Sequence, residues 1–442
     1  MHLLNYLRNK SFWVIDSLKG CNIRKHLDEI SSVINSPNSS NSLNIRKQHL
    51  ENLLKHAVNT TPFYKSYINA SSIMDFPVIK KTIIQDNFEQ FRSLPFKNKQ
   101  NFKVSTSGST GVPFFLFQDE NKRNRNRADA IHFLKCCNFE IGNRLFYLVA
   151  QLEHNQKSKF IPWVQNVNPV DVSKLTDEKI TEFLDMISKD QNPNKAILGH
   201  VSAFETIIQF LEKKNRKVDN IKLNSIIANS EYLSPQTKST LNKYFNTHAL
   251  SRYSSEEIGI MAHQTIDSPK NFVINHASYH IEVLNFENDN PVKPGELGRI
   301  VVTDLFNYAM PMIRYDTGDV AELITHDNGN MQFKQIEGRK MDLIYNSQGQ
   351  IVSSFLANTK LYKYYALLKQ YQFIQQGKKE YEIKLNLQGD TFPYENDLIE
   401  DVKKDFGKDA NVTITYVDEI PPLASGKRRK VVNNYQKKQT SY

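Results

Sequence analysis

The sequence predicts an α/β protein with a large N-terminal domain over residues 1–337 and a smaller α+β domain over residues 338–442. From about residue 100 onward, short strand-like runs alternate with helical stretches, which is typical of βα units. Past Gly338 the strands alternate in polarity around one helix, which indicates a separate module. A chain of 442 residues also favours two or three domains over a single core.

The first 70 residues form a predicted helical lead-in to the N-terminal domain. Over residues 22–70, apolar side chains recur at helical spacing from Leu50 to Ala57, and Pro62 follows the last of them. A loop rich in Asn and Ser at 36–44 divides this segment. We therefore expect two helices before the first strand.

The predicted strands and helices of the two domains follow from these patterns. In the N-terminal domain we predict strands at 145–150, 195–198, 225–228 and 299–303, and helices at 177–188 and 202–215. In the C-terminal domain we predict strands at 380–387 and 412–417 around a helix near 394–406.

Composition excludes several classes of protein. Hydrophobic residues at 39% and charged residues at 24% are ordinary for a globular chain, and no apolar run approaches the roughly 20 residues of a membrane helix. The segment Met1–Ile15 has no uninterrupted signal-peptide core. Cys21, Cys136 and Cys137 cannot form a disulfide framework. We therefore expect a cytoplasmic protein without a membrane segment.

The net charge of +10 lies largely in one C-terminal tail, which has no acidic residue after Glu419. Six cations supply it: Lys427, Arg428, Arg429, Lys430, Lys437 and Lys438. No basic stripe interleaved with aromatic residues accompanies them. We predict no nucleic-acid partner, and we interpret the tail after Lys427 as solvated or disordered.

The strongest chemical signal is a loop rich in hydroxyl groups and glycine, Ser105-Thr106-Ser107-Gly108-Ser109-Thr110-Gly111. Its main-chain N–H groups and hydroxyls could wrap a polyphosphate. The Walker pattern G-x-x-x-x-G-K-[ST] is absent from the sequence. Taken alone, this loop is also compatible with a flexible Ser/Gly turn.

Four later segments each suit a part of ATP. Tyr253 offers an aromatic face for a base, and Glu257, which follows Glu256, offers a carboxylate for Mg²⁺. Asp319 ends the segment Arg314-Tyr315-Asp316-Thr317-Gly318-Asp319 and could bind ribose hydroxyls.

The other two segments lie at and beyond the predicted domain boundary. Arg339 could reach ribose or phosphate, and Lys427 lies on a loop rich in Pro and Gly. A single lysine in such a loop suits an electrostatic clamp on a reacting phosphate.

These five segments, in this order, resemble the superfamily of adenylate-forming acyl-CoA synthetases and related ligases over most of the chain. The run from Leu53 to Tyr64 looks like the opening of the phenylacetate–CoA ligase family, especially its branch found with capsular-polysaccharide genes. The segment Asn229-Ser230-Glu231-Tyr232 resembles the adenine-side loop of that family.

The resemblance implies an AMP-forming ligase that uses ATP and Mg²⁺ and activates a small carboxylic acid as an acyl-adenylate. It assigns catalysis to Lys427 and Glu257, phosphate binding to the loop from Ser105 to Gly111, and nucleotide binding to five residues: Ser230, Glu231, Tyr253, Asp319 and Arg339. The acceptor stays open between CoA and an amine, sugar or other hydroxyl. A role in surface polysaccharide biosynthesis is implied only by the resemblance to the branch found with capsular-polysaccharide genes.

Two departures from the family pattern concern the metal and the hinge. Glu256 stands where the family has Ser or Thr, so both glutamates are candidates for Mg²⁺, and we favour Glu257 because it keeps the spacing to Gly259. The resemblance implies a mobile C-terminal lid that turns at Met341-Asp342, where the family has two acidic residues.

Histidines carry a weaker signal. His200 ends a buried strand, so it either lines the acyl pocket or is a partly buried structural histidine. His276 and His280 lie in Phe272–Leu284, which we predict to be one strand, and we assign them no metal. The competing function is a catalytically retired nucleotide-binding relative that serves as an interaction module. The oligomeric state is not predicted.

Overall fold

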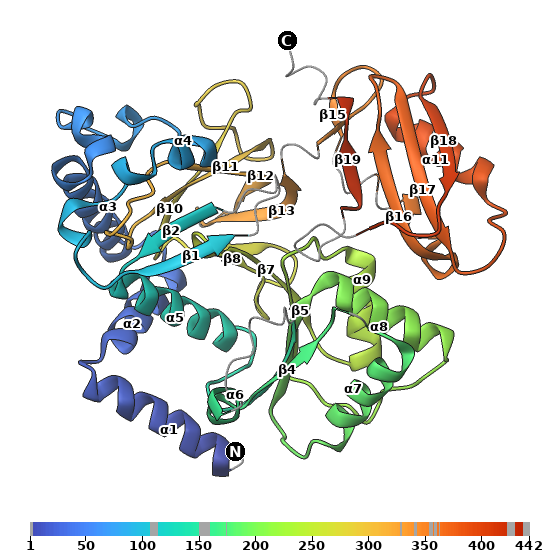
Figure 1. The fold of residues 1–442 in the computed structure, drawn as a ribbon, viewed down its shortest axis with the longest axis horizontal. Coiled ribbons are helices and arrows are strands. Elements are labelled where there is room, and N and C mark those ends of the chain that lie inside the picture. Colours follow the sequence, from blue (N-terminus) through green and yellow to red (C-terminus); the bar gives the residue numbers. More distant parts are fainter. Residues whose placement is uncertain are drawn as a thin grey trace.

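A computed structural model describes residues 3–106, 114–149, 160–173, 175–327, 329–339, 343–352, 357, 360–361, 363–421 and 429–435. Figure 1 shows a large N-terminal part built on one long sheet, with a smaller C-terminal part beside it. No helix in these ranges combines the length and hydrophobicity that crossing a membrane requires.

The lead-in consists of three helices, α1 (Leu3–Leu18), α2 (Asn22–Asn35) and α3 (Ser40–Thr60). The Ser39 hydroxyl accepts a hydrogen bond from the Ser42 N–H and caps α3, which ends where Pro62 prevents another helical turn. The prediction of two helices at 22–70 is confirmed, with a loop shorter than expected. Helix α1 lies within the predicted helical lead-in, before the two helices predicted at 22–70. It is attached to α2 because the Asp16 carboxylate accepts from the Ile23 and Arg24 N–H groups.

Short helices then lead to a hairpin. They are η1 (Pro62–Tyr67), η2 (Ile73–Asp75), α4 (Lys81–Asp86), η3 (Phe88–Gln90) and η4 (Leu94–Phe96). Strands β1 (Phe102–Thr106) and β2 (Phe114–Gln118) pair antiparallel, with Thr106 opposite Phe114. The predicted phosphate loop is therefore flanked by two paired strands.

The long sheet has 11 described strands in the order β10-β11-β12-β13-β9-β8-β7-β6-β5-β3-β4. Its parallel half contains β3 (Arg144–Val149), β4 (Val167–Asp171), β5 (Lys195–His200), β6 (Ser225–Asn229) and β7 (Ala249–Ser255). The helices between them are α6 (Phe160–Gln165), α7 (Asp177–Lys189), α8 (Val201–Lys213) and α9 (Pro235–Phe245). The predicted strands and helices of this half are confirmed within two residues at each end.

The antiparallel half contains β8 (Gly259–His263), β9 (Phe272–Ile274), β10 (Tyr279–Leu284), β11 (Leu297–Asp304), β12 (Tyr315–Thr325) and β13 (Met331–Arg339). The prediction of one strand over Phe272–Leu284 is wrong. The Asn275 side chain donates to the Ile260 carbonyl at 2.9 Å and its own carbonyl accepts from the Ser278 N–H, so a turn divides β9 from β10. The apolar alternation stops at Ile274 and resumes at Tyr279, so the two strands resemble one longer strand in the sequence.

The C-terminal part forms a second sheet, in the order β18-β17-β16-β19. Its elements are η7 (Tyr365–Leu367), β16 (Leu368–Gln375), β17 (Glu380–Leu387), α11 (Glu395–Phe406), β18 (Asn411–Tyr416) and β19 (Val431–Asn433), with the small pair β14 (Ile344–Tyr345) and β15 (Ile351–Val352). The predicted α+β pattern is confirmed. Its core, centred on Phe373, Leu398 and Phe406, is distinct from the apolar clusters of the N-terminal part.

A buried ion pair joins α5 (Glu120–Lys135) to the long sheet. The Lys122 ammonium lies 2.7 Å from the Asp304 carboxylate, and both side chains are fully buried. Lys122 also donates to the Tyr279 hydroxyl at 3.2 Å. A buried charge is stable only while its partner is present, so α5 depends on this pair for its position.

We predict that Lys122→Met destabilises the protein by about 3 to 5 kcal/mol, because the Asp304 carboxylate then stays buried without its partner. Urea unfolding followed by circular dichroism measures the change. Lys47→Met is the matched control, since Lys47 pairs with Glu51 on the exposed face of α3 and should leave the free energy of unfolding nearly unchanged. Equal midpoints for the two variants would contradict the prediction.

Candidate active site

Several predicted site residues lie at one edge of the parallel half-sheet. Strand β5 ends at His200, which pairs in register with Asn229 at the end of β6, and β7 follows β6 in parallel. The carboxyl ends of parallel strands form the edge where α/β sheets bind ligands. Ser230, Glu231 and Tyr253 therefore lie on this edge with His200.

The loop after β6 is fixed by its own backbone and by α8. Ser230 adopts a left-handed conformation with φ of 68°, and the Glu231 N–H donates to the Asn229 carbonyl at 2.9 Å. The Glu231 carboxylate accepts from the Ser202 N–H at 2.7 Å, so it caps the N-terminus of α8. The Asn229 Oδ1 atom is buried and has no hydrogen-bond partner among the described residues, so it could accept a hydrogen bond from a ligand.

Tyr253 and Asp319 are in direct contact across the sheet. The Tyr253 hydroxyl donates to Asp319 Oδ2 at 2.8 Å, and burial together with this carboxylate raises the Tyr253 pKa well above its usual value. The Asp319 N–H donates to Thr317 Oγ1 at 3.1 Å. Arg339 pairs in register with Asp319 from β13, so the backbone brings these three residues together.

Two ion pairs hold the chain in place from Arg314 to Asp319. The Arg314 guanidinium is buried against Glu282, with Nη2 at 2.9 Å, and Arg299 lies 3.1 Å from Asp316. The Gly318 N–H donates to Asp316 Oδ1 at 2.9 Å, and Gly318 has φ of +77°, a conformation that favours glycine. The segment from Arg314 to Asp319 thus contains both Asp319, which is the candidate ligand-binding residue, and the residues that hold it in position.

The two glutamates differ in their surroundings. Glu257 is partly buried and its carboxylate accepts from the Tyr315 hydroxyl at 3.4 Å, whereas Glu256 is exposed. Burial, followed by the charge of Glu257, raises the Tyr315 pKa. The described residues contain no cluster of three or more His, Cys, Asp or Glu side chains suited to a metal. A lone carboxylate at a phosphate site suits Mg²⁺, which takes its other ligands from water and phosphate.

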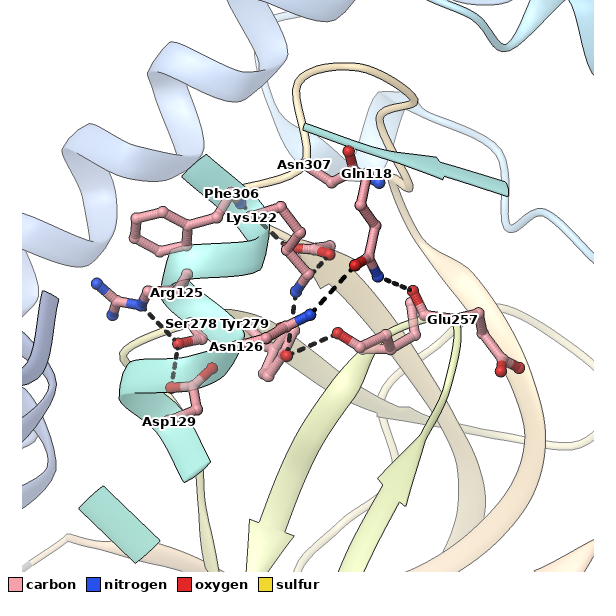
Figure 2. Close-up of polar contacts among 12 residues, drawn as sticks. Gln118, Lys122, Arg125, Asn126, Asp129, Glu257, Ser278, Tyr279, Phe306 and Asn307 are labelled. Carbon is pink, nitrogen blue, oxygen red and sulfur yellow. Dashed lines mark hydrogen bonds and ion pairs between the residues drawn. The ribbon is translucent and has the colours of Figure 1, made fainter. Parts of the chain in front are cut away.

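The turn that carries Glu257 rests on a polar layer from α5 and β10, shown in Figure 2. The Tyr279 hydroxyl donates to the Ile258 carbonyl at 2.8 Å, and the Gln118 amide makes a long contact of 3.5 Å with the Glu257 carbonyl. Asn126 donates to Gln118 at 3.4 Å. A Cβ atom at Gly259 would lie only 2.5 Å from the Tyr279 hydroxyl. Sequence reasoning missed these supports because they are spread over the chain without a motif.

Several predicted residues lie outside the described ranges. They are Ser107, Gly108, Ser109, Thr110 and Gly111 of the phosphate loop, Met341 and Asp342 of the hinge, and Lys427. Ser105 is exposed on β1, and Thr106 is its last residue. For Thr106 and Arg339 the backbone alone is described.

The basic tail is not wholly solvated, which corrects our interpretation of it. Lys430 lies 2.5 Å from the carboxylate of Glu205, a buried residue of α8, and β19 beyond it pairs in parallel with β16. Burial raises the Glu205 pKa, and the Lys430 charge opposes that shift. Gln209 of α8 also donates to the Leu368 carbonyl at 3.1 Å. The tail pattern showed charge but could not show that a buried acid on α8 would pair with it.

Comparison with known proteins gives a family match at the C-terminus and one curated relative. Residues 343–434 match the family described as CapK C-terminal domain. Protein CapK of Staphylococcus aureus is 21% identical over 418 residues, which cover 88% of this chain and 89% of that protein.

Solved structures match nearly the whole chain. 2-Hydroxyisobutyryl-CoA ligase in its postadenylation state, in complex with R3-HIB-AMP, matches with a TM-score of 0.72 and 14% identity over 91% of each chain. The same ligase with 2-HIB-AMP and CoA in the thioesterification state matches with a TM-score of 0.58 and 17% identity over 92% of this chain and 93% of that chain. This chain therefore has the fold of adenylate-forming ligases, with a large α/β N-terminal part and a smaller C-terminal domain.

We predict that Lys430→Met widens the average separation of the two parts, because the Glu205 carboxylate loses the charge that offsets its burial. Small-angle X-ray scattering measures the change in radius of gyration. The variant should raise the Glu205 pKa further, so the widening is large at high pH, where Glu205 is charged, and shrinks as Glu205 becomes protonated at lower pH.

Lys408→Met is the control for this experiment, because Lys408 is exposed on the C-terminal part. Its scattering should match that of the parent protein at every pH. A Lys430→Met protein with the same radius as Lys408→Met at high pH would contradict a role for the ion pair in holding the two parts together.

Proposed function

We propose that this protein is an ATP-dependent, AMP-forming ligase that activates a carboxylic acid as an acyl-adenylate and then transfers the acyl group. The observation that carries the proposal is the assembly of Tyr253, Asp319 and Glu257 around β7, at the carboxyl edge of a sheet with the adenylate-forming fold. The five ordered sequence segments support the same reaction. A nucleotide-binding relative without catalysis is the competing outcome of the tests below.

The nucleotide would be held by groups at this edge. Tyr253 would face the base, the buried Asn229 Oδ1 would accept from its amino group, and Asp319 with Arg339 would bind the ribose. Ser230 and Glu231 belong to the loop that closes the base side, where Glu231 acts through its bond to α8. The loop from Ser105 to Gly111 would receive the β- and γ-phosphates on main-chain N–H groups and hydroxyls.

In the activation step, an oxygen of the substrate carboxylate forms a bond to the α-phosphorus of ATP. The bond from that phosphorus to the bridging oxygen breaks, and pyrophosphate leaves with its electron pair. Negative charge spreads over the phosphate oxygens as the bonds change. We assign to the Lys427 ammonium the stabilisation of that charge, which is a transition-state interaction.

Glu257 is the residue that we propose as the protein ligand of Mg²⁺. When bound, Mg²⁺ would neutralise phosphate charge and orient the polyphosphate. The chain contributes a fixed carboxylate, because Tyr315 contacts the Glu257 side chain and Tyr279 holds the adjacent Ile258 carbonyl. Exposed Glu256 has no comparable support among the contacts of the described residues.

In the transfer step, the acyl carbon would be attacked by the acceptor and AMP would leave. We propose that, before this attack, the C-terminal part turns about Met341-Asp342, which withdraws Lys427, admits the acceptor and breaks the Glu205–Lys430 contact of the present arrangement. CoA is one candidate acceptor, because the similar ligase is solved with CoA, and an amine, sugar or other hydroxyl is the other.

The subfamily, the biological setting and the domain division are also proposals. The opening segment around Leu53 supports a phenylacetate–CoA ligase-like enzyme, and the relation to protein CapK supports a role in surface polysaccharide biosynthesis. We place the enzyme in the cytoplasm, where ATP is available. We assign residues 1–337 to an ATP- and acyl-binding domain and 338–442 to the lid, with His200 near the acyl pocket.

We predict that Lys427→Ala lowers carboxylate-dependent exchange of pyrophosphate into ATP by about 100- to 1,000-fold, because it removes a charge that acts in the transition state. Exchange is measured with a panel of aryl, short-chain, amino and uronic acids, and hydroxylamine traps the adenylates. Lys408→Ala, at an exposed position of the same part, should exchange like the parent. Near-normal exchange by Lys427→Ala would contradict the catalytic role proposed for Lys427.

If no acid in the panel stimulates ATP cleavage to AMP in the parent protein, the proposed function fails as a whole. A non-catalytic relative should still bind ATP, which calorimetry detects. ATP binding without any acid-dependent cleavage therefore identifies the competing function.

We predict that Glu257→Gln raises the Mg²⁺ concentration needed for half-maximal exchange by about tenfold or more, because an amide oxygen carries no charge for the cation. Glu256→Gln is the matched control in the same turn and should change that concentration little, since Glu256 is exposed. Titration of exchange with Mg²⁺ at saturating ATP measures both. The reverse order of effects would assign the metal to Glu256.

A further inference from the structure

Arg252 is a cation in the middle of the site that no part of the proposed reaction uses. It precedes Tyr253 on β7 and pairs in register with His263 of β8. Successive side chains of a strand point to opposite faces, so Arg252 points away from the face on which Tyr253 meets Asp319. It shares its face with Leu250, which packs in an apolar cluster with Leu198 and Ile227.

The guanidinium of Arg252 has no counter-charge. Its Nε and Nη2 atoms are buried and have no hydrogen-bond partner, and no ion pair joins it to a carboxylate of the described residues. Other buried arginines of this protein are paired: Arg125 with Glu29 at 2.6 Å, and Arg314 with Glu282 at 2.9 Å. Burying a cation without a partner costs several kcal/mol in typical proteins, so a cation in this state is suited to an anion that arrives from outside.

Three neighbours of Arg252 are uncharged at neutral pH, although the Glu256 carboxylate also acts on one of them, Tyr147. Burial raises the pKa of the Cys137 thiol to about 12 and raises that of the Tyr147 phenol. Burial, with the nearby Arg252 charge, lowers the His263 pKa to about 3, so this histidine stays neutral. A cation among neutral groups and an apolar cluster presents strong, unscreened charge to a ligand.

The position of Arg252 indicates which part of a ligand it would meet. Tyr147 lies on β3, opposite Leu198 of the strand that His200 ends, and it packs against the same apolar cluster as Leu250. Arg252 as a whole is partly exposed although two of its nitrogens are buried, so part of the residue faces solvent. Because Tyr253 and Asp319 occupy the opposite face of β7, Arg252 faces away from the proposed nucleotide side, and we assign its face to the acyl group.

We propose that Arg252 binds a second acidic group on the acyl substrate, so that the enzyme activates dicarboxylic acids, with one carboxylate at the reacting phosphate and the other on Arg252. The planar fork of a guanidinium matches a carboxylate through two parallel hydrogen bonds. The proposal rests on the proposed function and narrows its substrate class.

The test compares matched pairs of acids in pyrophosphate exchange: dicarboxylates of three to six carbons, and the monocarboxylates of the same chain lengths. The parent protein should show kcat/KM at least about 100-fold higher for one dicarboxylate than for its matched monocarboxylate. Arg252→Met should abolish that preference by raising KM for the dicarboxylate, and it should leave or improve exchange with the monocarboxylate. Arg252→Lys should keep part of the preference, since it keeps the charge but not the fork.

Two controls separate specificity from folding. Arg252→Met exchanges an unpaired buried cation for an apolar side chain, so its thermal unfolding midpoint should equal or exceed that of the parent. Arg24→Met changes an exposed arginine of α2 and should leave the preference unchanged. Equal use of both acids by the parent, or an equal loss of both in Arg252→Met, would overturn the proposal.

A binding measurement distinguishes failure of this proposal from failure of the proposed function. If only monocarboxylates support exchange, the proposed ligase function stands and the proposed role of Arg252 is overturned. If no acid supports exchange, calorimetry with each dicarboxylate at saturating ATP tests whether the protein binds the acid without activating it. Binding by the parent that Arg252→Met loses would support the dicarboxylate site without the ligase reaction, and no binding would overturn both.

Discussion

The pairing of β7 is the constraint on which the rest of the site depends. This strand is parallel to β6 on one side and antiparallel to β8 on the other, so it joins the two halves of the long sheet. Its carboxyl end leads directly into the turn of Glu257, while one of its faces presents Tyr253 to Asp319 and the other presents Arg252. In the proposed site, the nucleotide therefore binds on one face of β7 and the acyl group on the other, and the metal binds at the turn that follows this strand.

The buried cationic side chains behind the site are paired with carboxylates, whereas a buried arginine in the site itself is not. Behind the Glu257 turn, Lys122 is paired with Asp304, and Arg125 lies between Glu29 and the Ser278 hydroxyl, so these buried cations are paired and α5 is rigidly attached. On the ligand side, Asn229 Oδ1 and the Arg252 guanidinium are buried without partners. Buried polar atoms without a hydrogen-bond partner also occur in the support, such as Asn126 Oδ1 and Asp129 Oδ2, but Asn229 Oδ1 and the Arg252 guanidinium belong to the strands whose carboxyl ends form the proposed site.

The contact between the two parts of the chain is also electrostatic, and it lies close in sequence to the proposed catalytic lysine. Lys430 pairs with buried Glu205 three residues after Lys427, and three residues of chain reach only about 11 Å. Lys430 keeps some exposure to solvent, whereas both side chains of the Lys122–Asp304 pair are fully buried, so water can replace the Lys430–Glu205 contact more readily. The interface thus suits a small part that occupies two positions during the proposed reaction cycle.

The sequence by itself determined the local structure and the chemical class of the site. Periodicity predicted the βα units, the C-terminal α+β module and, within two residues, the ends of six strands. The motifs placed Tyr253, Glu257 and Asp319 in one proposed reaction. Only the tertiary structure decided which charges meet, because such pairs join residues far apart in the chain: Glu205 with Lys430, and Lys122 with Asp304. The tail that looked solvated is in part a strand, and the single strand predicted over Phe272–Leu284 is two, because local pattern carries no information about the distant groups that a segment contacts. For the same reason the sequence could not distinguish Arg252, a buried cation without a partner, from the paired arginines around it.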